Sequence, residues 1–261
     1  MAATDHRLPE DAFPLIVAHR GAPSTHPENT LSSFEAAIGL GAWIVELDVR
    51  VSADGVPVVM HDATVDRTTD GSGSVHELTA AELARLNAGA DDAPVPVPTL
   101  AEVLDLASGR AAVALEMKNL PGEPGHDPRR EAAVEAAHDE LERTAFRGAV
   151  LVISFNPASI ATSRAIAPEV PTGFLTTELV DPREALAYAV SAGHEMVLPG
   201  TRALEPVGEA FVDEVHAAGL RVGTWTADEP GEVSRLLGWG VDAVASNDPA
   251  MALGVLAAHR G

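Results

Sequence analysis

The fold is decided by the stretch Ile44-Val45-Glu46-Leu47-Asp48-Val49, an apolar and β-prone run that contains two carboxylates. Residues two apart on a strand point to the same face, so Glu46 and Asp48 share one face and the apolar residues pack on the other. Two like charges on a buried strand repel and lose hydration, which is tolerable where one is protonated or a cation binds both. The stretch therefore favours a cation site over its alternative, an edge strand with a solvated polar face.

Strand and helix signals alternate on both sides of this stretch. Before it, the apolar run 15–18 ends in His19-Arg20-Gly21, and Asn29 or Thr30 caps a helix that reaches residue 40. From residue 99 onward, helices alternate with six further strands, predicted at residues 112–118, 150–155, 172–176, 196–199, 221–226 and 243–247. A last helix is predicted at residues 249–259. Eight strands and eight helices in this order predict an α/β fold, a TIM (β/α)8 barrel with its active site at the C-terminal ends of the strands.

Residues 50–98 interrupt the alternation. Ala53-Asp54-Gly55 predicts a hairpin turn, and the apolar run that follows it ends at His61. The remainder is rich in Thr, Asp, Gly, Ser and Pro, with one helix predicted at residues 79–86. We interpret residues 50–98 as a small insertion after strand two that folds His61 over the barrel mouth, and residues 1–261 as a single barrel domain.

Composition excludes several classes of function. The chain has 261 residues, a formal net charge of −22 and no cysteine. It therefore has no disulfide, thiolate metal site or cysteine nucleophile, and its charge argues against a nucleic-acid partner. No apolar run approaches membrane-spanning length, and no basic amphipathic stretch favours stable membrane association. These features predict a soluble, cytoplasmic protein.

The barrel rule gathers polar residues from three strand ends at one mouth. They are His19 and Arg20 from the first strand, Glu46 and Asp48 from the second, and Glu116 and Lys118 from the third. Three carboxylates without a thiolate form a hard oxygen site that suits Mg²⁺ or Ca²⁺. The alternative is a structural ion-pair network that joins Glu116 to Lys118 and Glu46 to Arg20.

The charges at this mouth favour an anionic ligand. Three carboxylates, one divalent cation, Arg20 and Lys118 sum to plus one, which a phosphodiester monoanion neutralises. The guanidinium fork of Arg20 matches phosphate oxygens, and Lys118 adds a point charge. His19 and His61 on opposite sides of a phosphorus atom would serve as a base for the attacking hydroxyl and an acid for the leaving alkoxide.

An ordered set of motifs spans nearly the whole chain. It consists of His19-Arg20-Gly21, Pro27-Glu28-Asn29-Thr30, Glu46-Leu47-Asp48-Val49, Asp54-Gly55-Val56-Pro57-Val58-Val59-Met60-His61-Asp62, Arg67-Thr68-Thr69, Leu115-Glu116-Met117-Lys118, Ser154-Phe155 and Trp225-Thr226. Together these motifs resemble the glycerophosphodiester phosphodiesterase family. The resemblance implies a barrel with an insertion after strand two, a divalent metal, and hydrolysis of small-molecule glycerophosphodiesters to sn-glycerol 3-phosphate and an alcohol.

Site residues follow from the resemblance by position. It implies metal binding by Glu46, Asp48 and Glu116, acid–base catalysis by His19 and His61, phosphate binding by Arg20 and Lys118, and apolar walls for the glycerol from Phe155 and Trp225. Two other functions stay open on the same motifs. One is a lysophospholipase D-like phosphodiesterase, and the other is a metal- or phosphate-binding barrel without turnover.

The chain departs from the family's common pattern in two places. Trp225-Thr226-Ala227-Asp228 stands where the family often has Trp-Thr-Val-Asn, and Ser246-Asn247-Asp248-Pro249 stands where Thr-Asp-x-Pro is common. Neither departure removes a catalytic group, so both bear on the shape of the substrate pocket.

Overall fold

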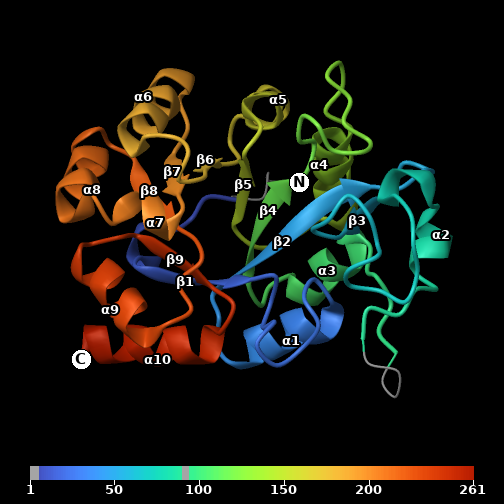
Figure 1. The fold of residues 1–261 in the computed structure, drawn as a ribbon, viewed down its shortest axis with the longest axis horizontal. Helices are drawn as coiled ribbons and strands as arrows, with labels where there is room; N and C mark the ends of the chain where they lie inside the picture. Colours follow the sequence, from blue (N-terminus) through green and yellow to red (C-terminus); the bar gives the residue numbers. More distant parts are fainter. Residues whose placement is uncertain (1–5, 90–93) are drawn as a thin grey trace.

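The apolar runs predicted as strands pair in parallel and close into a ring. The structure, a computed structural model, describes residues 6–89 and 94–261. Around the ring the strands are β1 (Leu15–His19), β2 (Ile44–Val51), β4 (Ala112–Met117), β5 (Val150–Ser154), β6 (Thr172–Thr176), β7 (Met196–Pro199), β8 (Arg221–Thr224) and β9 (Ala243–Ser246). Because β1 pairs with both β2 and β9, the sheet has no free edge there, and the predicted TIM barrel is confirmed (Figure 1).

Helices surround the ring on the outside (Figure 1). Those that alternate with the barrel strands are α1 (Leu31–Gly39), α3 (Leu100–Ala107), α4 (Ala132–Thr144), α5 (Pro157–Ile166), α6 (Pro182–Ala192), α8 (Gly208–Ala217), α9 (Pro230–Gly238) and α10 (Pro249–Arg260). A short α7 (Thr201–Leu204), which the sequence did not predict, precedes α8. Polar caps start several of these helices: the side chains of Thr30, Asn156 and Asp248 accept from backbone N–H groups of α1, α5 and α10.

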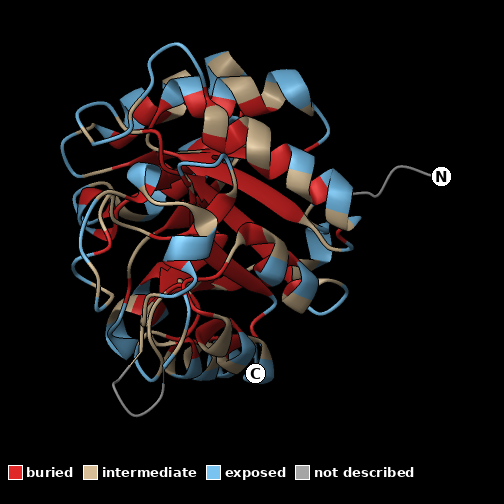
Figure 2. Cartoon of the chain, turned by 90° about the vertical axis from the view of Figure 1, so that its right-hand side faces the viewer, coloured by how far each residue is buried: buried red, intermediate tan, exposed pale blue. Residues whose placement is uncertain are grey.

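Alternation along β2 sorts its side chains as predicted. Val45, Leu47 and Val49 lie in the apolar layer between the strands and the helices. Ile44 belongs instead to the cluster that fills the barrel interior, where Leu8 and Phe13 from the N-terminal segment also pack. Burial follows the same division, because the strands are mostly buried and the helices are buried on their inner faces (Figure 2). Glu46 and Asp48 therefore share the interior face with Ile44.

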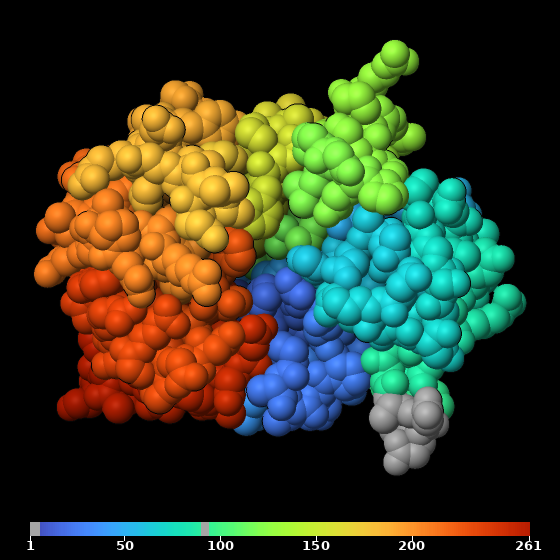
Figure 3. All heavy atoms as spheres, viewed as in Figure 1, coloured from blue at the N-terminus to red at the C-terminus, as the bar shows by residue number. Residues whose placement is uncertain are grey.

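The insertion after β2 folds around a small apolar cluster of its own. Its β3 (Pro57–Val59) pairs antiparallel with β2 and confirms the predicted hairpin. The described residues of the insertion also form two short helices, η2 (Val75–Glu77) and α2 (Ala80–Leu83). The buried cluster consists of Val58, Met60, Val65, Val75, Leu83 and Val97. The cluster holds the insertion together, and the pairing of β3 with β2 places it beside the barrel, where it lies next to the loop after β1 (Figure 3).

One helix in the insertion is shorter than predicted. The pattern indicated residues 79–86, whereas α2 ends at Leu83. After that residue, the N–H of Leu86 donates to the carbonyl of Leu83, which is the tighter hydrogen-bond spacing of a turn. The tighter turn lets the Leu86 side chain pack against the apolar cluster. No helix among the described residues is long and apolar enough to cross a membrane.

Candidate active site

Strand register alone brings the predicted carboxylates together. The pairing of β1 with β2 sets His19 opposite Glu46, and the pairing of β2 with β4 sets Asp48 opposite Glu116. Glu46, Asp48 and Glu116 are buried, and one oxygen atom from each lies within 4.8 Å of those of the other two. The prediction that strand ends would gather these side chains at one mouth is therefore confirmed.

Two cationic side chains contact this trio. Lys118 Nζ lies 3.0 Å from Asp48 Oδ1 and forms an ion pair with Glu116, and Arg20 Nε lies 3.3 Å from Asp48 Oδ2. The alternative to a metal site was an ion-pair network of Glu116 with Lys118 and of Glu46 with Arg20. The structure contains the first of these two pairs. The guanidinium of Arg20 pairs with Asp48 and Glu28 instead of Glu46, which accepts from the backbone N–H of Arg20 at 3.0 Å.

The ion pairs do not balance the charge of the trio. Burial raises the pKa of Glu46 to about 8, and Asp48 adds to the rise. Burial likewise raises the pKa of Glu116 to about 7, although Lys118 opposes the rise. Burial alone would raise the pKa of Asp48 too, but Lys118 and Arg20 lower it overall. A cation that bound all three carboxylates would supply the missing positive charge.

The donor set fits a hard divalent cation. Among the described residues, none donates a hydrogen bond to the buried Oε1 of Glu46. A buried carboxylate oxygen without a donor is costly unless something else occupies its lone pairs. Three carboxylates from strands also suit the oxygen preference of Mg²⁺ and Ca²⁺.

The loop after β1 has a strained backbone that places Arg20. Arg20 and Gly21 both have positive φ, +54° and +89°. A Cβ at Gly21 would lie 2.4 Å from Ser33 Oγ, so this close turn requires glycine. Asn29 also has positive φ and donates from Nδ2 to Asp48 Oδ2 at 2.7 Å, while Thr30 caps α1. Asn29 therefore holds a site carboxylate, a role that its predicted capping position did not indicate.

His19 lies at the end of β1 between an amide and a carboxylate. Its Nδ1 is 2.7 Å from Asn247 Oδ1, and its Nε2 is 3.9 Å from Glu46 Oε2. Burial lowers the pKa of His19, and the charge of Arg20 lowers it further. The ring is therefore neutral near pH 7 and can accept a proton.

His61 reaches the same pocket from the insertion. Its Nδ1 lies 2.6 Å from Asp62 Oδ1, and burial, followed by the charge of Lys118, lowers its pKa. Arg67 donates to both Asp62 and Glu28, and Glu28 also accepts from Arg20. This chain of contacts joins the insertion to the loop after β1.

Arg50 fixes the backbone at His61. Its Nε and Nη2 donate to the His61 carbonyl at 2.9 and 2.6 Å, and Nη2 also donates to Glu123 at 2.8 Å. Arg50 lies two residues after Asp48 on β2, so the strand period places it on the same face as Glu46 and Asp48. That spacing could have predicted its burial. Its contacts were not predictable, because they depend on the path of the insertion and of the loop after β4.

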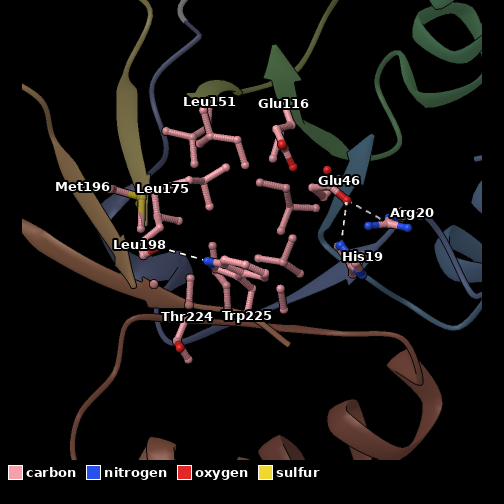
Figure 4. A pocket seen from close by; sticks show the side chains of 18 of the residues that line it. His19, Arg20, Glu46, Glu116, Leu151, Leu175, Met196, Leu198, Thr224 and Trp225 are labelled. Carbon is pink, nitrogen blue, oxygen red and sulfur yellow. Dashed lines mark hydrogen bonds and ion pairs between the residues drawn. The ribbon is translucent and has the colours of Figure 1, made fainter. Parts of the chain in front are cut away.

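The pocket has one polar and one apolar wall (Figure 4). His19, Arg20, Glu46 and Glu116 lie on one side, and Leu175, Leu198 and Trp225 lie on the other. The rings of Phe155 and Trp225 meet edge to face with their centroids 5.2 Å apart, and Trp225 Nε1 donates to the Leu198 carbonyl. Both aromatic residues line the same pocket as His61 and Lys118. All of the predicted site residues thus converge, with Asp48 fully buried behind Lys118 and Arg20.

Comparison with known proteins identifies the family. Residues 19–251 match the Glycerophosphoryl diester phosphodiesterase family. The chain belongs to this family. A glycerophosphodiester phosphodiesterase of Bacillus subtilis is 33% identical over 254 residues, covering 90% of this chain and 84% of that protein. One from Caldanaerobacter subterraneus is 32% identical over 246 residues, covering 90% and 94%.

Solved structures agree with the family. An Oleispira antarctica phosphodiesterase in complex with the product sn-glycerol-3-phosphate superposes with a TM-score of 0.85 at 27% identity, covering 95% of this chain and 98% of that one. A putative glycerophosphoryl diester phosphodiesterase from Silicibacter pomeroyi gives a TM-score of 0.83 at 29% identity, with 94% of each chain covered. These relatives confirm the predicted family, barrel fold and enzyme class, a phosphodiesterase.

Proposed function

We propose that this phosphodiesterase hydrolyses glycerophosphodiesters to sn-glycerol 3-phosphate and an alcohol, with a divalent metal and with His19 and His61 as its acid–base pair. The observation that carries the proposal is a buried carboxylate trio with uncompensated charge, set between two histidines and two cationic side chains. Such a site has the charge and the proton-transfer groups that a phosphodiester requires.

Glu46, Asp48 and Glu116 are the proposed ligands of Mg²⁺ or Ca²⁺. When bound, the cation would stabilise negative charge that develops on the phosphate oxygens. Arg20 and Lys118 lie beside the trio and would bind the same phosphate, the first through its fork and the second as a point charge.

The two histidines would move the protons. In each ring Nδ1 is engaged by a neighbour, Asn247 for His19 and Asp62 for His61, so Nε2 is the nitrogen left for the substrate. One ring would take the proton of the attacking hydroxyl while the other protonates the leaving alkoxide. Phe155 and Trp225 would cover the glycerol carbons and exclude water from that side.

A turnover assay tests the proposal. The purified protein is incubated with glycerophosphocholine, glycerophosphoethanolamine or a lysophospholipid, with chelator and then with added Mg²⁺ or Ca²⁺, and products are followed by phosphorus NMR. We expect sn-glycerol 3-phosphate from the first two substrates, loss of turnover in chelator and recovery with metal. Full turnover in excess chelator would contradict the metal site. Preference for the lysophospholipid would indicate the lysophospholipase D-like alternative, and no turnover of any substrate would indicate a binding protein.

A further inference from the structure

Asp228 is connected to His19 through the side chain of Asn247. Asp228 follows β8 and Asn247 follows β9, so two loops of the barrel mouth meet here. Asp228 Oδ1 accepts from the backbone N–H of Asn247, and Asp228 Oδ2 accepts from Asn247 Nδ2, both at 2.7 Å. On the other side, Asn247 Oδ1 lies 2.7 Å from His19 Nδ1. The carboxylate, the amide and the imidazole thus form a continuous hydrogen-bonded chain.

The chemistry of the three groups fixes the direction of this chain. An ionised carboxylate only accepts hydrogen bonds, so the NH₂ end of the Asn247 amide must face Asp228. The oxygen end then faces His19, and this contact forms only when His19 Nδ1 carries the proton. Nε2 is then unprotonated in the neutral ring, and it is the nitrogen on the side of Glu46. The backbone N–H of Asn247 holds the other oxygen of Asp228 whichever way the amide is turned.

We propose that Asp228 is a positioning residue that orients the Asn247 amide and thereby holds His19 in its Nδ1–H tautomer. This inference rests on the proposed function, in which His19 exchanges a proton with substrate through Nε2. If the amide were turned over, its NH₂ end would face Nδ1, and the ring would have to carry its proton on Nε2. His19 could not then accept a proton at that atom.

The two departures from the family's common pattern meet in this contact. This chain carries Asp228 and Asn247, whereas the motifs that it resembles imply Asn at position 228 and Asp at position 247. The two changes are reciprocal, and the residues touch through two hydrogen bonds. The pair keeps one carboxylate and one amide but places the amide against His19. Both oxygens of a carboxylate accept hydrogen bonds, so a carboxylate would accept from His19 Nδ1–H in either orientation. An amide accepts through its oxygen only, so Asn247 needs Asp228 to set its orientation.

Three variants test the proposal. Asp228→Asn removes the group that requires the NH₂ end of Asn247. The double variant D228N/N247D places a carboxylate directly against Nδ1–H. Asp248→Asn is the matched control, because it makes the same charge change at the residue next to Asn247. The Asp248 side chain accepts from the backbone N–H of Met251 and caps α10.

The decisive measurement is the tautomer of His19. Long-range nitrogen–proton NMR distinguishes Nδ1–H from Nε2–H, and the His19 signals are assigned by their absence in His19→Ala. Spectra are taken roughly two pH units above the ordinary imidazole pKa of about 6.5, where the ring is neutral. We expect Nδ1–H in the wild type, a gain of Nε2–H in Asp228→Asn, and Nδ1–H again in the double variant and the control.

Turnover gives a second measurement. In a serine hydrolase triad, loss of the carboxylate that orients the histidine lowers kcat about 10⁴-fold, because the wrong tautomer forms. The effect should be smaller here, because Asp228 acts on His19 through an intervening amide. We therefore expect kcat of Asp228→Asn to fall about 10- to 100-fold with KM changed less than about twofold, and the double variant to recover most of the loss. The control should keep wild-type kcat.

Each outcome decides the proposal. Wild-type tautomer and kcat in Asp228→Asn would overturn it, as would an equal effect of the control or an Nε2–H tautomer in the double variant. Should Asp228→Asn fail to fold, the wild type and the double variant still test the proposal, because an Nε2–H tautomer in either would overturn it. The NMR measurement needs no turnover, so the tautomer shift would stand even if the proposed substrates were not hydrolysed.

Discussion

The barrel and the insertion each supply one histidine to the site, and they hold it by different means. His19 belongs to β1, and the pairing of β1 with β2 sets it opposite Glu46. His61 follows β3, and its ring is held by Asp62, which is held in turn by Arg67. We call the part of the site around His19 the barrel half and the part around His61 the insertion half. The barrel half is placed by backbone register, and the insertion half is placed by contacts between partly exposed side chains.

This difference predicts how each half responds to substitution. Backbone register is shared by many hydrogen bonds and is lost only when the strands separate. A side-chain contact can be removed singly, and an exposed ion pair contributes only about 0–1 kcal/mol to stability. Catalysis depends more strictly than stability on the positions of the catalytic groups, because a displacement of about 1 Å can reduce a rate about 10²-fold. Substitutions in the insertion half should therefore change kcat far more than stability.

The largest effect should come from the histidines themselves. We expect His19→Ala and His61→Ala each to lower kcat roughly 10²- to 10⁴-fold, the usual scale for a lost acid or base. Metal affinity should stay near the wild-type value, because the proposed ligands are carboxylates. The measurements are steady-state kinetics and calorimetric titration with Mg²⁺ or Ca²⁺. Near wild-type turnover in His61→Ala would show that the insertion half is structural only.

A substrate with a good leaving group separates the two roles. Such a substrate needs no protonation of its leaving oxygen, so it should restore turnover only to the variant that lacks the acid. Rescue of both variants, or of neither, would contradict a division into one acid and one base. The same assay therefore shows whether the barrel or the insertion supplies the acid.

A smaller effect is expected from Arg67→Ala. Arg67 donates to both Asp62 and Glu28, so its loss should loosen His61 and lower kcat about 10- to 100-fold with little change in stability. Arg110→Ala is the matched control, because Arg110 forms a similar pair with Glu35 away from the site and its side chain is 42% exposed, against 48% for Arg67. Equal kinetics for the two variants would mean that the insertion half is positioned without Arg67.

The same difference explains what the sequence could predict. Glu46, Asp48 and Glu116 were predictable because strand periodicity and the barrel rule together determine their face and their end of the barrel. The hairpin to His61 was predictable from Ala53-Asp54-Gly55. The short α7 was missed, because four residues are too few to show a helical period.

Long-range polar contacts were beyond sequence reasoning. Arg67 and Glu28 are 39 residues apart, and their contact depends on how the intervening insertion folds. Asp228 and Asn247 stood out only as departures from a pattern, and nothing in the sequence indicated that they touch. The alternative ion-pair network joined Arg20 to Glu46, whereas the guanidinium of Arg20, a residue with positive φ, pairs with Asp48 and Glu28.

The pH dependence of metal binding should report the barrel half alone. In the metal-free fold the pKa values of Glu46 and Glu116 are about 8 and about 7, so below pH 7 both are largely protonated and metal must displace their protons. Affinity should therefore rise with pH up to about 8, by about tenfold per unit for each proton released. Calorimetry in buffers of different ionisation enthalpy counts those protons.

Stability of the metal-free protein should change in the opposite direction. Because both folded-state pKa values lie above the ordinary value of 4.5, the folded state binds more protons than the unfolded state between pH 4.5 and 8. These two groups therefore lower the free energy of unfolding as pH rises through that range, and metal should offset the loss. His61→Ala is the control for the metal titration, because it should release the same number of protons as the wild type when metal binds. A metal affinity independent of pH would contradict the protonation of Glu46 and Glu116.

The smallest effect concerns salt, which acts on both halves. The net charge of −22 repels an anionic substrate over the Debye length, roughly 30 Å at 0.01 M salt and about 8 Å at 0.15 M. Screening should therefore raise kcat/KM for anionic glycerophosphoglycerol relative to zwitterionic glycerophosphocholine, by about twofold over that range. Salt also weakens the exposed contacts of Arg67, but that loosening lowers both rates together and cancels in their ratio. Saturating metal, with chloride as the only added anion, excludes metal loss and phosphate competition. If the ratio stays constant while both rates fall, the buried cations Arg20 and Lys118 dominate the field that the substrate meets, and the global charge does not matter.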